Sequence, residues 1–181
     1  MTTSTSTGDP IRDDLLEALA KHRDLFRVTA AGLTEDQARL TPTASSLGVG
    51  GLVKHVTSVE AEWARFVVDG PVDMPEVDWE HIDWTNPPPE AVAYAEGFRM
   101  RDDETLEGLL AAYDEQAART DELVRTVELG ARQPLPAAPW FEPGASWSAL
   151  RVFVHVVAET AQHAGHADII RETIDGQKSM G

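Results

Sequence analysis

The 181-residue sequence contains no cysteine. This absence excludes a disulfide framework, a cysteine-based zinc finger and a thiol nucleophile, so any metal must be held by His, Asp or Glu. Basic residues are also scarce, because 15 Lys and Arg stand against 31 Asp and Glu and leave a formal net charge of −16. A surface of this sign repels nucleic-acid phosphates and anionic lipids, which argues against a nucleic-acid partner.

Long apolar runs are missing as well. No stretch approaches the roughly 18 apolar residues that a transmembrane helix needs, and residues 1–9 carry neither the basic nor the apolar part of a targeting signal. We therefore expect a cytoplasmic protein with no membrane partner. The length suits one domain, which we place at 11–176 between a disordered, small and polar tail at 1–10 and a C-terminal tail at 177–181.

Apolar residues recur at helical spacing in four long segments. The predicted helices run from Ile11 to a cap at Gly32, over 52–68, from Leu106 to Gly130, and from about Trp147 to Ile174. Ser146 is the expected N-cap of the last helix, after a proline-rich turn at 134–143. We see no alternating strand pattern and no repeat. The sequence predicts an all-α four-helix bundle, with one long crossover connecting helices two and three.

Shorter signals lie between these helices. The spacing of Thr34 and Gln37 is that of a capping box and predicts a helical turn at 35–40, and residues 90–98 form a second short candidate. The proline-rich stretch 71–89 has no period, so its tryptophans, Trp79 and Trp84, either cover a site or plug the end of the core. The glycines of LGVGGL are too irregular for a phosphate cradle and are interpreted as a flexible lead into the second helix.

Polar residues fall on the apolar face of the fourth predicted helix. Glu159, His163 and His166 interrupt its apolar stripe. An unpaired carboxylate there would cost several kcal/mol in desolvation, so it must be protonated, paired with a cation or bound to a metal. A metal is the interpretation that also explains the two histidines.

Glu159 and His163 are four residues apart, which brings both side chains over one helical turn to a single ion. His55 is the leading third ligand because it falls inside the apolar arc of the second helix, although it could instead be a hydrogen-bonded core histidine. Two imidazoles and one carboxylate leave a coordination position open, as in catalytic zinc sites; iron, nickel and other divalent ions accept the same donors. No inward Glu is followed three residues later by His, so a di-iron bundle is excluded.

The remaining histidines receive different interpretations. His155 precedes Glu159 by one turn and is expected to be a core or supporting group. His166 could be a fourth ligand, a supporting donor or an acid–base group beside the open position. His22 has no acidic partner at ligand spacing and reads as structural, while His81 lies among acids in the long connection and reads as solvated.

Two segments, GVGGLVKHVTSVE at 48–60 and HVVAETAQHAGHADIIRETIDG at 155–176, resemble the DinB/YfiT-like superfamily. Within the superfamily, the closer likeness is to the metal-binding domain of its actinobacterial branch, which is related to mycothiol-dependent maleylpyruvate isomerase. The segment GLTEDQARL at 32–40 shares this likeness. The resemblance implies a four-helix bundle in which one histidine of the second helix and an i, i+4 pair of the fourth hold a metal. These positions are His55, Glu159 and His163.

The resemblance also implies a chemistry. Enzymes of this superfamily use a low-molecular-weight thiol such as mycothiol, and a divalent ion, most simply zinc, would hold its sulfur as a thiolate that attacks an electrophile. An S-transferase, isomerase or detoxification enzyme follows, with His166 as the candidate catalytic proton donor and a homodimer as a common assembly. A metal-assisted hydrolase and a non-catalytic, small-molecule-binding or stress-associated bundle remain the alternatives.

Overall fold

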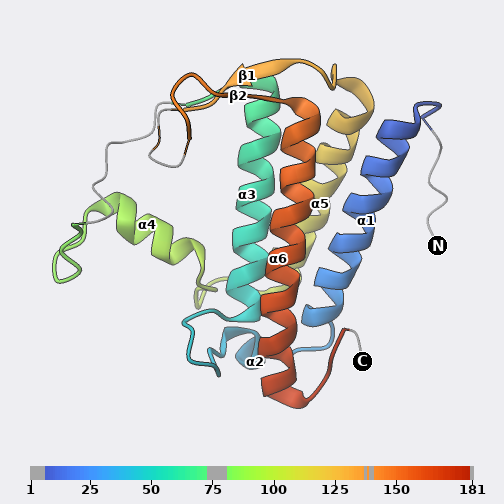
Figure 1. Cartoon of the computed structure of the whole chain (residues 1–181). Helices are drawn as coiled ribbons and strands as arrows, with labels where there is room; N and C mark the ends of the chain where they lie inside the picture. The colour runs from blue at the N-terminus through green and yellow to red at the C-terminus, as the bar shows by residue number, and fades with distance from the viewer. Residues whose placement is uncertain (1–6, 73–80, 137, 139–140, 180–181) are drawn as a thin grey trace.

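Four long helices lie side by side in a bundle (Figure 1). The computed structural model describes residues 7–72, 81–136, 138 and 141–179. Its elements in chain order are α1 (Pro10–Ala30), α2 (Glu35–Arg39), α3 (Val49–Asp69), α4 (Pro89–Gly97), α5 (Leu106–Thr126), β1 (Arg132–Pro134), β2 (Ser146–Ser148) and α6 (Ala149–Asp175). The predicted all-α four-helix bundle is thereby confirmed, and its long helices are α1, α3, α5 and α6.

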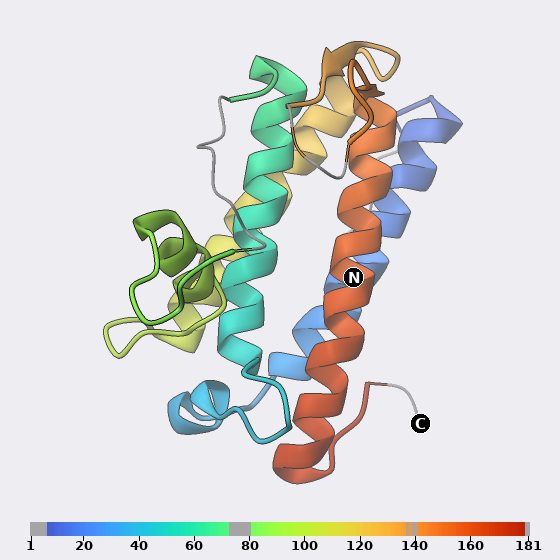
Figure 2. The same ribbon diagram turned by 60° about the vertical axis from the view of Figure 1, so that its left-hand side comes forward.

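The packing order of the helices positions α3 beside α6. Helix α6 packs against α1 and α3, and α5 packs against α3 on the far side. The connection between α3 and α5 carries α4, which lies outside the bundle in both ribbon views (Figure 2). Helix α4 therefore stands beside the face that α3 and α6 form together.

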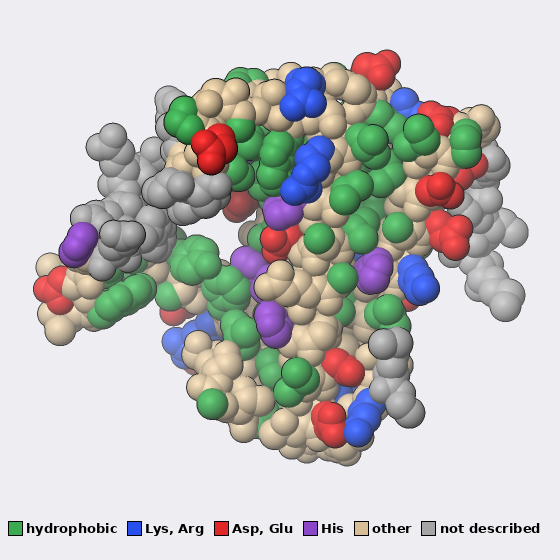
Figure 3. Space-filling view, in the orientation of Figure 1, with side chains coloured by type: hydrophobic (Ala, Val, Ile, Leu, Met, Phe, Trp, Pro, Cys, Tyr) green, Lys and Arg blue, Asp and Glu red, His purple; other side chains and the backbone are tan. Residues whose placement is uncertain are grey.

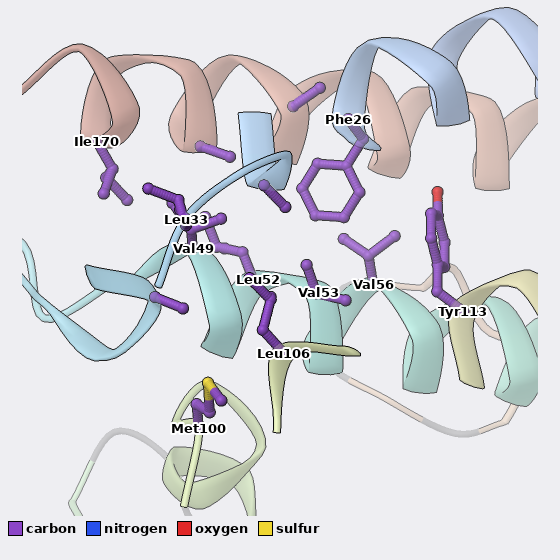
Figure 4. Packing of buried hydrophobic residues seen from close by; sticks show 14 residues of the cluster. Phe26, Leu33, Val49, Leu52, Val53, Val56, Met100, Leu106, Tyr113 and Ile170 are labelled. Carbon is purple, nitrogen blue, oxygen red and sulfur yellow. The ribbon is translucent and has the colours of Figure 1, made fainter. Parts of the chain in front are cut away.

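Apolar side chains fill the bundle in two clusters, one at each end. In the cluster around α2, Figure 4 shows Phe26, Val53 and Val56 pointing toward one another between α1 and α3. The ring of Tyr113 meets Phe26 edge-on, with 5.6 Å between the centroids. Each fully buried side chain of this size stabilises the fold by about 1.5 to 3 kcal/mol. Burial of these helix faces holds α3 and α6 in fixed register.

The glycines at the start of α3 are a packing device. Gly50 and Gly51 are helical and buried, so their interpretation as a flexible lead was wrong. A Cβ atom on Gly51 would overlap the carbonyl oxygen of Phe98, and one on Gly50 would overlap the Met100 side chain. Because these glycines have no side chains, the segment after α4 can approach α3 closely. A local sequence pattern does not predict such a long-range contact.

The N-terminal boundaries differ slightly from prediction. Helix α1 begins at Pro10 and is capped by the Asp9 side chain, so Pro10 does not belong to the tail in which we placed it. The helix ends with Ala31 as its C-cap, and Gly32 follows in the left-handed region with φ 76°. The capping box of Thr34 and Gln37 is confirmed.

A short hairpin was also missed. Strands β1 and β2 pair antiparallel, with Arg132 opposite Ser148 and Pro134 opposite Ser146. Ser146 therefore lies in a strand, and the cap of α6 is Ser148, whose side chain accepts a hydrogen bond from the Arg151 backbone nitrogen. Strands of three residues are too short to show an alternating pattern.

Some of the predicted features lie in residues that the structure does not describe. Most of the predicted disordered tail, residues 1–6, and Trp79, within 73–80, lie outside the described residues. Trp84 is described and 64% exposed, so it does not plug the core. Among the helices described, none combines the length and apolarity that crossing a membrane requires.

A charged network occupies the bundle interior. The Arg23 guanidinium donates to a Glu60 oxygen at 2.5 Å and to an Asp121 oxygen at 2.7 Å. Arg23 is 2% exposed and Glu60 is 1% exposed, whereas the Asp121 side chain is 27% exposed. Arg23 therefore joins α1 to α3 through an ion pair that is almost completely removed from water, and joins α1 to α5 through a second pair whose Asp121 side chain is partly exposed.

Candidate metal centre

The structure brings His55 of α3 together with Glu159 and His163 of α6. Each residue offers one ligand atom, and these three atoms lie within 4.8 Å of one another. Glu159 and His163 meet because they are one turn apart, and His55 meets them because α3 packs against α6. The juxtaposition expected from the sequence is present in the folded chain.

The three side chains differ in exposure, because His163 is buried whereas His55 and Glu159 are partly exposed. The imidazole rings of His55 and His163 are 4.8 Å apart between centroids and steeply inclined, at 77°. An oxygen of Glu159 lies 3.6 Å from Nε2 of His163. The Glu159 side chain is 27% exposed, so it lies at the edge of the apolar stripe, where we had expected it inside. Figure 3 shows histidine and acidic side chains gathered on the face of α3 and α6, where the surface is hollowed toward α4.

Burial keeps the two histidines of the cluster uncharged at neutral pH. It lowers the pKa of His55 to about 4, with a further contribution from neighbouring His163. Burial also lowers the pKa of His163, against the opposing attraction of Glu159. Neutral imidazoles carry the free lone pair that a metal ligand needs. The electrostatics therefore suit coordination.

The donor set fits a divalent transition metal. Two imidazole nitrogens and one carboxylate oxygen form the usual three-ligand set of catalytic zinc sites, with bonds of about 2.0 to 2.2 Å. Ligand atoms that held such an ion would lie closer together than the 4.8 Å limit of this cluster. Nickel and iron accept the same donors, so the geometry leaves the choice among these metals open.

Both histidines of the cluster have an aromatic neighbour. The ring of Phe98 stacks on His55 at 3.9 Å and 22°, as the Gly51 contact allows. Nδ1 of His166 lies 3.5 Å from Nδ1 of His163. Phe98 was missed entirely, although the glycine pair that admits it was visible in the sequence.

The structure also describes the three histidines that belong neither to the cluster nor to the contact of His166 with it. His155 is half-buried and lies 3.5 Å from the second oxygen of Glu159. His22 is half-buried on α1, a helix that contributes no residue to the cluster. His81 is exposed in the connection before α4.

Comparisons with known proteins place the fold and the family. A crystal structure described as the conserved protein of locus from Enterococcus faecalis is similar over 91% of this chain and 97% of its own, with a TM-score of 0.63 and 16% identity, which shows the fold alone. No curated protein matches the chain. The sequence model described as Mycothiol-S-transferase matches residues 14–176 and confirms the resemblance drawn from the two segments. The chain belongs to the mycothiol-S-transferase family.

Proposed function

We propose that this protein joins mycothiol, through its sulfur atom, to an electrophilic small molecule, using a divalent ion held by His55, Glu159 and His163. The observation that carries the proposal is the convergence of these three side chains, from two helices, in a chain of this family. Zinc is the simplest ion for this donor set, with nickel and iron as alternatives. The absence of cysteine means that the nucleophilic sulfur comes from the cosubstrate.

When bound, the ion would lower the pKa of a coordinating thiol until the thiolate is available at neutral pH. The chain supplies the surroundings for this chemistry. Glu159 contributes one negative charge against the charge of the ion, and the neutral imidazoles contribute none. The Phe98 ring covers one face of His55 and keeps water from that side of the ligand.

The overall reaction releases a proton and a leaving group. The thiol S–H bond breaks, a sulfur–carbon bond forms, and the leaving group departs from the electrophile with its electron pair. His166 is the proposed proton-transfer group because it is half-buried beside His163. With Nδ1 directed to His163, its Nε2 is the atom that holds or releases the proton.

An assay with mycothiol and monochlorobimane tests this function. Zinc-loaded protein is expected to accelerate formation of the fluorescent conjugate, and Glu159→Ala and His163→Ala are expected to return the rate to the uncatalysed background. His22→Ala removes a half-buried histidine outside the cluster and is expected to keep full activity. His166→Asn is expected to lower kcat about 100-fold or more while the ion is retained. Equal rates in wild type and Glu159→Ala would contradict the proposal.

The same three donors also suit a metal-assisted hydrolase, because an ion with an open position can generate hydroxide near neutral pH. The assay separates the two activities by omitting the thiol. Turnover that requires mycothiol supports the S-transferase, whereas hydrolysis of an ester or amide substrate without any thiol would favour the alternative.

A further inference from the structure

The carboxylate of Glu159 lies between two histidines of its own helix. One oxygen, Oε2, lies 3.6 Å from Nε2 of His163, and the other, Oε1, lies 3.5 Å from Nε2 of His155. The three residues follow one another at i, i+4 spacing on α6, so the contacts come from a regular helix without distortion. The two oxygens of one carboxylate are thus directed to different partners.

The His155 ring is held from outside α6. Trp63 of α3 and Trp147 of β2 contact it edge-on, with centroid separations of 4.9 and 5.1 Å. These two indoles stack on each other at 5.0 Å and 19°, and the Arg151 guanidinium lies 4.2 Å from the Trp147 centroid. The ring orientation is therefore determined by α3 and the hairpin, independently of Glu159.

We propose that His155 is a positioning residue, whose Nε2–H donates to Oε1 of Glu159 and thereby leaves Oε2 for the ion shared with His55 and His163. This inference rests on the proposed metal site. Carboxylate ligands are commonly held by a hydrogen bond from a neighbouring side chain, which fixes their orientation and strengthens metal binding. Glu159 needs such a partner because its side chain is partly exposed and could otherwise turn to water.

The proposal also gives the hairpin a function. Strands β1 and β2 have three residues each, and Trp147 of β2 stacks on Trp63 of α3. Trp147 then contacts His155, which contacts Glu159. Through this chain of contacts, an element remote from the cluster determines how one ligand is presented.

Zinc affinity measured by competition with a chromogenic chelator tests the role. His155→Phe keeps an aromatic ring in contact with the two indoles but removes the donor, and it is expected to weaken zinc binding about 10- to 100-fold. His155→Gln retains an N–H donor and is expected to restore most of the affinity. His22→Phe is the matched control and is expected to bind zinc as wild type does. The Tm of each metal-free variant reports any loss of folding separately.

A second measurement is independent of variants. In zinc-loaded wild type, 15N chemical shifts of His155 are expected to show the proton on Nε2. A proton on Nδ1, or a His155→Phe protein that binds zinc as tightly as wild type, would overturn the role of His155 and leave the metal site intact. A wild-type chain with no zinc affinity would instead refute the proposed function, and this role with it.

Discussion

The buried pair of Arg23 and Glu60 allows a quantitative test of the fold. Replacing Arg23 by Met removes the guanidinium but keeps a long apolar side chain of similar reach. Glu60 is 1% exposed, and one of its oxygens bonds to Arg23 while the other has no hydrogen-bond partner among the described residues. After the substitution, the carboxylate is left buried without a partner.

The expected cost follows from this geometry. Removing one member of a buried ion pair destabilises a protein by about 3 to 5 kcal/mol, because the remaining charge is not compensated. Arg23 also bonds to Asp121, whose side chain is 27% exposed and can be solvated after the change, so little is added from that contact. Arg23→Met is therefore expected to lower the free energy of unfolding by about 3 to 5 kcal/mol. This is a large part of the 5 to 15 kcal/mol that is typical of a domain.

A double substitution separates charge from packing. Arg23→Met with Glu60→Leu removes both charges and is expected to recover most of the lost stability, since apolar replacements of buried pairs are often neutral or stabilising. Urea unfolding of metal-free protein, followed by circular dichroism, measures the wild type, both single variants and the double variant. A cost below about 1 kcal/mol for Arg23→Met would show that Glu60 reaches water and would refute the reasoning, as would a double variant no more stable than the single.

Two further predictions concern the surroundings of the cluster. Gly51→Ala is expected to destabilise the protein by about 1 to 3 kcal/mol, because the new Cβ overlaps the Phe98 carbonyl. The helical control Gly165→Ala meets no atom within 4 Å and should stabilise it by about 0.5 to 1 kcal/mol; equal Tm shifts would contradict the close contact. Acidification is expected to destabilise the metal-free protein between pH 6.5 and 4, because the folded-state pKa of His55 is lowered to about 4 and the unfolded chain binds protons first. The stability that neutral His55 contributes is fully present above pH 6.5. If the urea midpoints at pH 7 and pH 4.5 coincide, the pKa shift of His55 is absent.

Local patterns predicted the parts of the molecule that local interactions determine. The four helices follow from apolar spacing within single segments, and the capping box of α2 lies within four residues. Glu159 and His163 are neighbours by helix geometry alone. Assigning His55 to the same cluster required in addition the face it occupies on α3 and the resemblance of the two segments.

The missed features depend on contacts between distant residues. Gly51 reads as a loop residue until Phe98, 47 positions later, is known to pack against it. Glu60 reads as a surface carboxylate until Arg23 of another helix is placed beside it. The β1–β2 pairing is likewise set by tertiary position, because three residues carry too little pattern to predict a strand.

Metal analysis of the purified protein tests the central claim most directly. After incubation with zinc and removal of unbound ion, elemental analysis of wild type and His22→Ala is expected to find about one ion per chain. Single replacements of His55, Glu159 or His163 by alanine are expected to lose most of it while the protein remains folded. Zinc that is absent from wild type, or equally abundant after all three ligands are replaced, would contradict a metal centre between α3 and α6.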